Sequence, residues 1–201
     1  MRTVILAFVL LLARAVADEA PAGSAQSVVT HLQDGLIALM QKGEAGAART
    51  DAVAALLRDT HDIPYICRVV LGRHWRELSS DEQESFIRQF EALSVASYDS
   101  RFRRYNGERF DVDPEETVSE DERNVRSVLT TGTGAQHEFV YLLHRDGERW
   151  RIVNIVVDGV SDLALKRAEY GRLMDSGGFA ALSAELAEQT ERMRARAAGS
   201  T

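Results

Sequence analysis

The stretch HEFVYLLHRDGERWRIVNIVV, residues 137–157, decides the fold of this chain. β-Branched and aromatic residues fill its two halves, 137–145 and 149–157, and such residues favour extended strands. Asp146-Gly147 stands between the halves, and glycine readily takes the positive φ angle of a tight turn. The stretch therefore predicts a β-hairpin of two neighbouring antiparallel strands.

Two further strands are predicted before the hairpin. Residues 110–112 and 124–131 have the same composition, and turn-forming residues follow them at Asp113-Pro114 and at 132–134. No helical pattern separates the predicted strands, and strands that follow one another directly pair antiparallel. We therefore expect one antiparallel sheet.

Helical periodicity fills most of the remaining chain. Apolar residues recur every three or four positions in five segments: 28–39, 53–57, 64–71, 163–174 and 179–193. The strongest helix start is Ser79-Ser80-Asp81-Glu82, a capping box followed by an aromatic stripe from Phe86 to Tyr105. This pattern predicts a long helix that ends at 106–107, and the tail from residue 194 is predicted to fray because it has no apolar stripe.

Together these elements predict an α+β fold in a single domain, with helices packed on one face of a twisted antiparallel sheet. A long helix laid over a twisted sheet diverges from it at one end. Apolar space left there would form a cavity suited to a hydrophobic ligand.

The composition is that of an ordinary globular protein. Of 201 residues, 45% are hydrophobic and 27% are charged, which excludes a disordered chain and a collagen-like chain. The formal charge of −7 disfavours unaided binding to nucleic acid or to anionic lipid surfaces. The single cysteine, Cys67, cannot form a disulfide within one chain, and we interpret it as a small buried residue.

The first residues are typical of a secretory signal peptide. Arg2 precedes an apolar run at 4–12, and the small residues at 15–17 suit a signal peptidase. The run is shorter than the roughly 20 apolar residues that cross a bilayer. We expect residues 1–17 to be removed and 18–201 to be exported as a soluble, untethered protein, whose formal charge changes from −7 to −9 because two arginines are lost.

The sequence shows no catalytic or metal-binding pattern. The five histidines, at 31, 61, 74, 137 and 144, lack the spacing of metal ligands. We interpret His61 and His74 as solvated surface residues. No nucleophile and base or carboxylate pair stands out, so the sequence predicts a protein that is not an enzyme and has neither a metal nor a cofactor.

Several stretches together resemble the MlaC (toluene-tolerance, ABC-transporter auxiliary) family of periplasmic lipid carriers. The similarity lies in 71–75, in the helix start at 79–90, in 141–143 and above all in WRIVNIVVDGVS at 150–161, and it extends over nearly all of the predicted mature chain. Three shorter stretches are more similar to the hopanoid-associated HpnM branch of the family: 98–102, 106–110 and 162–164.

The resemblance implies a soluble, monomeric periplasmic carrier that binds a phospholipid or hopanoid-type lipid in an apolar cavity. It also implies exchange of that lipid with an inner-membrane substrate-binding and ABC-transporter complex and with an outer-membrane lipoprotein complex. With strand alternation, it gives these candidates for the cavity wall: Trp75, Phe90, Tyr98, Phe102, Phe139, Tyr141, Trp150, Ile152 and Leu163. Ser161 and Arg167 are candidates for contact with a lipid head group at the mouth.

Two alternative functions remain open at this point. An enzyme related to nuclear transport factor 2 has a similar cone-shaped α+β fold and needs ionisable groups that converge inside its cavity. An interaction subunit of an ABC transporter would have a solid core without a cavity. The interior of the folded protein distinguishes these alternatives from a lipid carrier.

Overall fold

The computed structural model describes residues 23–199, and the predicted signal segment 1–17 lies outside them. The helices are α1 (Ala25–Lys42), α2 (Ala47–Thr60), α3 (Ile63–Leu71), the short 3-10 helix η1 (Gly72–Glu77), α4 (Ser80–Arg101) and α5 (Asp162–Gly199). The strands are β1 (Arg109–Val112), β2 (Glu116–Thr117), β3 (Glu122–Thr130), β4 (Gln136–Asp146), β5 (Arg149–Val157) and β6 (Val160–Ser161). The predicted α+β fold is confirmed.

The strands form one antiparallel sheet in the order β1-β3-β4-β5-β6, with β2 paired to β3. The predicted hairpin is the β4–β5 pair, and Gly147 takes a φ of 61° in its turn. Tyr141 lies opposite Val125 on one side and Ile155 on the other, at the centre of the sheet. A register shift between Leu142 and Leu143 bends the sheet there.

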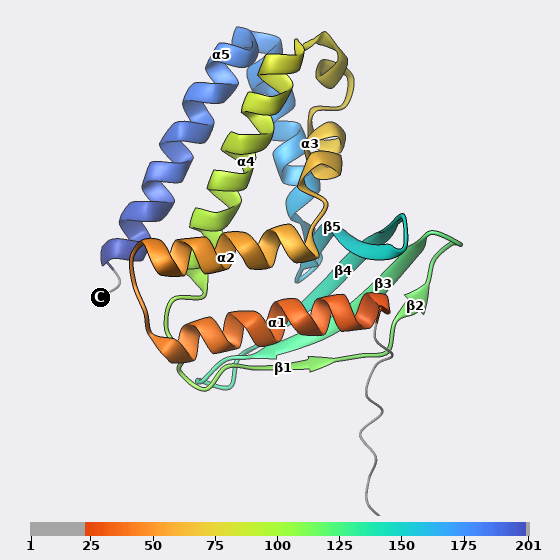
Figure 1. The fold of residues 1–201 in the computed structure, drawn as a ribbon, viewed down its shortest axis with the longest axis vertical. Coiled ribbons are helices and arrows are strands. Elements are labelled where there is room, and N and C mark those ends of the chain that lie inside the picture. The colour runs from red at the N-terminus through yellow and green to blue at the C-terminus, as the bar shows by residue number, and fades with distance from the viewer. Residues whose placement is uncertain (1–22, 200–201) are drawn as a thin grey trace, which may run out of the picture.

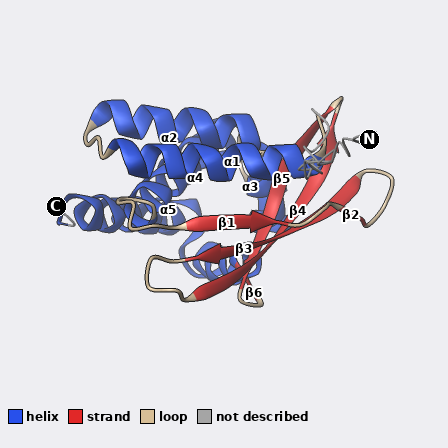
Figure 2. Ribbon diagram, turned by 90° about the horizontal axis from the view of Figure 1, so that it is seen from below, coloured by secondary structure: helices blue, strands red, loops and turns tan. Residues whose placement is uncertain are grey.

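The helices form two groups (Figure 1). Helices α1 and α2 lie side by side, and α1 lies over the sheet, where it contacts β1, β3 and β5 (Figure 2). Helices α3, α4 and α5 pack on one another and rise away from the sheet, although α3 and α5 still contact β5. Strand β5 therefore contacts both groups, which also meet directly where α2 packs on α4.

The long helix α4 begins as predicted and ends earlier than predicted. The Glu82 backbone N–H donates to Ser79 Oγ, and the Glu82 carboxylate accepts from the Ser79 N–H at 2.8 Å. The helix stops at Arg101 because the buried Arg49 guanidinium from α2 binds the Phe102 carbonyl and holds the chain there. The predicted continuation to 106–107 is wrong.

Helix α5 agrees with the prediction in its middle and differs from it at its C-terminal end. Gly178 has a φ of 62° and divides α5 into two helical halves, as its Gly177-Gly178 pair suggested. The tail does not fray, because the helix continues to Gly199 with Ala197 buried.

The interior consists of two hydrophobic clusters. The sheet cluster joins α1 and α2 to the inner face of the sheet and includes Leu32, Leu57, Val125 and Leu143. The helix cluster joins α3, α4 and α5 and includes these residues: Cys67, Phe86, Phe90, Tyr170, Leu182 and Leu186. Cys67 is fully buried, as predicted.

Candidate functional site

A cavity of about 520 Å³ lies where the sheet cluster and the helix cluster meet. Leu32 and Leu57 belong to its sheet-cluster wall, and Ile66, Phe90 and Val153 belong to its helix-cluster wall. Most of the lining side chains are aliphatic or aromatic. The volume is within the range of about 300–1,000 Å³ that is usual for small-molecule sites.

The structure brings most of the predicted cavity residues to this one site. These residues line it: Phe90, Tyr98, Phe102, Phe139, Tyr141, Ile152 and Leu163. Tyr98 stacks on Phe102 at 5.9 Å and Phe139 stacks on Tyr141 at 6.0 Å between ring centroids, and the ring of Phe110, which is not a lining residue, joins the two pairs. The C-terminal end of α4 and strand β4 therefore both contribute aromatic residues to the cavity wall.

Trp75 and Trp150 are not among the lining residues, and this corrects their predicted placement. Trp75 belongs to η1 and packs, half buried, against the helix cluster. Trp150 is buried at the hairpin end of β5, where the guanidinium carbons of Arg123 and Arg145 each lie 4.7 Å from the centre of its ring system. Trp150 lies on the predicted strand, but its indole ring is covered by the two arginine side chains and is not part of the cavity lining.

Ser161 and Arg167 are also absent from the lining. The Ser161 hydroxyl donates to Asn154 Oδ1 at 3.1 Å and accepts from the Ala164 N–H at 3.2 Å, so it caps the start of α5. Arg167 lies beside Gly72, where a β-carbon would come within 3.4 Å of its guanidinium.

The charged residues of the lining are instead Arg101, Asp162 and Lys166. Lys166 Nζ lies 3.7 Å from Asp162 Oδ1 and 6.0 Å from the centre of the Phe90 ring. The prediction from sequence missed both cations, although helical spacing places Arg101 three residues after Tyr98 and Lys166 three after Leu163. This spacing of three was the signal that could have found both cations, because residues three positions apart lie on the same side of a helix.

One pair of lining residues, His61 and Tyr98, is in hydrogen-bond contact within the wall. The Tyr98 hydroxyl lies 3.3 Å from His61 Nε2, and the opposite ring nitrogen of His61 lies 2.9 Å from Thr60 Oγ1. His61 is only 8% exposed, so its predicted place on the solvated surface is wrong. His74 is buried as well, with its Nδ1 2.7 Å from a Glu77 carboxylate oxygen.

This pair meets the geometric requirement of the enzyme alternative but not its chemical requirement. Burial lowers the pKa of His61 to about 4 and raises the pKa of Tyr98 above its ordinary value. A general acid or base works best with a pKa close to the ambient pH. At neutral pH both groups are therefore uncharged, and they are suited to hydrogen bonding rather than to proton transfer.

A family comparison identifies the chain. The model of the MlaC protein family matches residues 30–188. The chain belongs to the MlaC family. Among curated relatives of this MlaC-family chain, the toluene tolerance protein ttg2D of Pseudomonas putida is 24% identical over 165 residues, which cover 81% of this chain and 77% of the relative.

A solved structure shares the MlaC-type fold. It is the phospholipid-binding protein from Ralstonia solanacearum, determined in complex with a phospholipid, and it superimposes with a TM-score of 0.72. The match covers 85% of this chain and 98% of the other, at 16% sequence identity. The similarity therefore concerns the fold.

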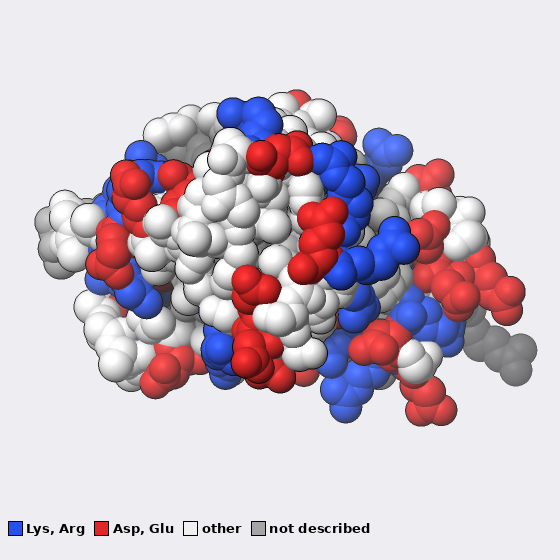
Figure 3. Space-filling model, turned by 90° about the horizontal axis from the view of Figure 1, so that it is seen from above, with Lys and Arg blue, Asp and Glu red and all other residues white. Residues whose placement is uncertain are grey.

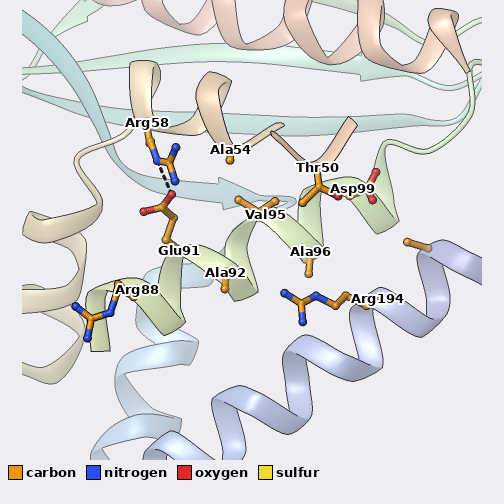
Figure 4. A pocket seen from close by; sticks show the side chains of 11 residues that line it. Thr50, Ala54, Arg58, Arg88, Glu91, Ala92, Val95, Ala96, Asp99 and Arg194 are labelled. Carbon is orange, nitrogen blue, oxygen red and sulfur yellow. Dashed lines mark hydrogen bonds and ion pairs between the residues drawn. The ribbon is translucent and has the colours of Figure 1, made fainter. Parts of the chain in front are cut away.

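A second hollow, of about 300 Å³, lies between α2, α4 and the end of α5 (Figure 4). Its floor is made of small side chains, and Arg58, Arg88 and Arg194 stand around it. Each of these arginines pairs with a carboxylate, as Arg58 does with Glu91 at 2.6 Å. This hollow is smaller than the main cavity and lacks its aromatic walls, so the main cavity is the candidate site.

Charges of both signs are mixed on the face seen from above in Figure 3, around a central uncharged area. The net negative charge of the chain is therefore not concentrated on that face, which gives little long-range steering of a charged partner. Within residues 23–199, no three His, Cys, Asp or Glu side chains gather as a candidate metal site. Among the helices of this described part, none is both long enough and apolar enough to cross a bilayer.

Proposed function

We propose that this MlaC-family protein is a periplasmic carrier that binds a phospholipid or hopanoid-type lipid and carries it between membranes. The observation that supports this function best is the cavity of about 520 Å³ between the two hydrophobic clusters. A preformed space with apolar walls is what an acyl chain or a fused-ring lipid needs in order to leave water.

The energetics of burial favour a lipid over a polar ligand. Each methylene group that moves from water into the apolar wall contributes about 0.8 kcal/mol. Phe102, Phe139 and Ile155 supply wall surface that is only partly covered by protein. Arg101 and Lys166 border the same space and would pair with an anionic head group while the chain lies inside.

The cellular role in this proposal extends beyond the cavity. The relative named for toluene tolerance and the structural neighbour crystallised with a phospholipid support a lipid ligand. The signal-like segment 1–17 supports a periplasmic location. The carrier would exchange lipid, as a monomer, with an inner-membrane ABC-transporter complex and with an outer-membrane lipoprotein complex.

The first test is the content of the protein itself. Protein purified from the periplasm without detergent should carry lipid, visible as a mass increment by native mass spectrometry and identifiable after solvent extraction. A protein that is empty when purified and that takes up no lipid from vesicles would contradict the proposal.

A matched pair of variants separates cavity binding from loose surface binding. Ile155 lines the cavity, whereas its neighbour Val156 on the same strand does not. Ile155→Asp places a carboxylate in the apolar wall and should reduce bound lipid at least tenfold, because an isolated charge is costly to desolvate. Val156→Asp is the control and should retain lipid. Equal retention by both folded variants would place the lipid elsewhere.

A further inference from the structure

The contacts around His61 determine which groups donate and which accept in the hydrogen bond between His61 and Tyr98 in the cavity wall. The Thr60 hydroxyl lies 2.8 Å from the Leu56 carbonyl oxygen. A carbonyl oxygen only accepts, so this contact uses the single proton of the Thr60 hydroxyl. Toward His61, at 2.9 Å, Thr60 Oγ1 can then only accept. The His61 Nδ1 therefore carries the ring proton.

The next contact follows from this tautomer. The His61 ring is buried and uncharged at neutral pH, so its Nε2 has no proton and is an acceptor. The Tyr98 hydroxyl, 3.3 Å away, donates its only proton to that nitrogen. Within residues 23–199, no group donates a hydrogen bond to the Tyr98 oxygen, and Tyr98 lines the cavity. Its oxygen is thus free to accept and has no proton left to donate.

We propose that the cavity prefers lipids with a hydroxyl group on the part that is buried, and that Tyr98 Oη accepts the hydrogen bond from that group. This inference rests on the proposed function and narrows its ligand class. A lipid hydroxyl that enters an apolar cavity needs an acceptor, because a buried donor without a partner is costly. An ether or ester oxygen at the same point would meet another acceptor and gain nothing.

The rest of the lining holds both apolar and polar side chains. Leu57, Ile63 and Phe90 offer no acceptor, whereas the cavity is also lined by polar residues that can accept: Ser94, Ser97, Asn154 and Asp162. Tyr141, the other phenol in the lining, differs from Tyr98: its oxygen accepts from Gln33 Nε2 at 3.1 Å, and its own proton is left to donate to either kind of ligand oxygen. Tyr98 is therefore the hydroxyl of the aromatic wall whose oxygen can accept from a ligand but has no proton to donate, and the test removes this group.

Two probes of equal length test the inference: tetradecanol and its methyl ether, each titrated by displacement of a fluorescent fatty probe. Wild-type protein should bind the alcohol about tenfold more tightly, the scale of one net hydrogen bond. Tyr98→Phe keeps the ring and should bring the two affinities within about twofold. Tyr170→Phe removes a phenol hydroxyl outside the cavity lining, so it is the matched control and should keep the wild-type ratio.

A further variant tests the direction of the hydrogen bond between Tyr98 and His61. Thr60→Val removes the acceptor for His61 Nδ1–H at nearly unchanged volume, so the ring can adopt either tautomer. The preference for the alcohol should fall, since Tyr98 can then also act as a donor toward the ether.

Each outcome of the titrations is decisive. Equal affinity of wild-type protein for the two probes, or an unchanged ratio in Tyr98→Phe, overturns the inference and leaves lipid binding intact. Failure of both probes to bind wild-type protein, together with failure to take up vesicle lipid, overturns the proposed function and this inference with it. The wild-type ratio is informative even if a variant does not fold.

Discussion

The two hydrophobic clusters differ in the hydrogen bonding of the polar groups buried in or beside them. The sheet cluster is bordered by polar side chains that bond across elements, such as Gln33 Nε2 with Ser127 Oγ at 2.8 Å and Arg49 with Asp99 at 2.5 Å, although Gln33 Oε1 is buried without a partner among the described residues. The helix cluster contains the Tyr170 hydroxyl, which is buried without a hydrogen-bond partner among the described residues. The polar side chains beside the sheet cluster thus add directed contacts between elements to its packing, whereas the Tyr170 hydroxyl in the helix cluster adds none.

This difference explains where the cavity can exist. An unfilled apolar space costs stability in proportion to its size when the walls cannot collapse. Here each cluster is closed on its own side, and the open space is confined to the boundary between them. Two separate cores can hold their own elements in place while the boundary remains available to a ligand.

The largest expected effect comes from the buried arginine of the sheet cluster. Arg49 is 1% exposed and binds Asp99 together with the carbonyl oxygens of Leu39 and Phe102. Arg49→Ala leaves these groups without their shared partner and should lower the free energy of unfolding by about 3–5 kcal/mol. Urea unfolding followed by circular dichroism measures this loss.

The matched control is an exposed arginine of the same helix. The Arg58 side chain is 65% exposed and pairs with Glu91, so Arg58→Ala should cost no more than about 1 kcal/mol. Similar losses for the two variants would mean that the network around Arg49 does not hold the sheet cluster together.

The next largest effect is a pH dependence of the unfolding free energy caused by His61, which lines the cavity between the two clusters. In the unfolded chain His61 takes up a proton near pH 6.5, whereas in the folded protein burial lowers the pKa of His61 to about 4. The unfolded state binds the proton first as the pH falls, so the folded state loses up to about 3 kcal/mol across this window. His61→Gln should show a shallower decline in unfolding free energy between these pH values. The same decline in both proteins would contradict the burial of His61.

Local rules explain what could be predicted from the sequence. The hairpin at Asp146-Gly147 and the capping box at Ser79 depend on neighbouring residues alone, and the structure contains both. Phe139, Tyr141 and Phe90, which line one cavity, were predicted from the family resemblance together with strand alternation, so local rules alone did not identify them.

Long-range contacts explain what could not be predicted. The Asp62 N–H donates to the Ile152 carbonyl oxygen at 3.1 Å and attaches the link between α2 and α3 to the sheet. That contact draws His61 into the cavity, and nothing in the local sequence indicates it. Trp150 was misplaced for a similar reason, because Arg123 comes from another strand to cover its ring.

A third prediction compares a core position with a wall position. Leu143 is 0% exposed within the sheet cluster, whereas Leu163 faces the cavity and is half buried. Leu143→Ala should cost about 3 kcal/mol, because it removes packed surface and leaves a void. Leu163→Ala removes fewer contacts, because one side of the residue already borders open space, and should cost about 1 kcal/mol. Equal costs in thermal or urea unfolding of the lipid-free protein would indicate that the cavity is closed in solution.

The smallest expected effects come from removing one hydroxyl in each cluster. Tyr141 in the sheet cluster accepts from Gln33 at 3.1 Å, so Tyr141→Phe removes a hydrogen bond and should lower the free energy of unfolding by about 1 kcal/mol. The Tyr170 hydroxyl has no partner within residues 23–199, and its ring packs edge-on against Phe86 at 6.2 Å between centroids. Tyr170→Phe keeps that packing and relieves the desolvated hydroxyl, so it should leave stability unchanged or raise it by up to about 1 kcal/mol. Changes of opposite sign in the free energy of unfolding would establish that the two clusters are stabilised differently. Equal losses would show that the Tyr170 hydroxyl has a partner in solution, and that the clusters differ less than their contacts suggest.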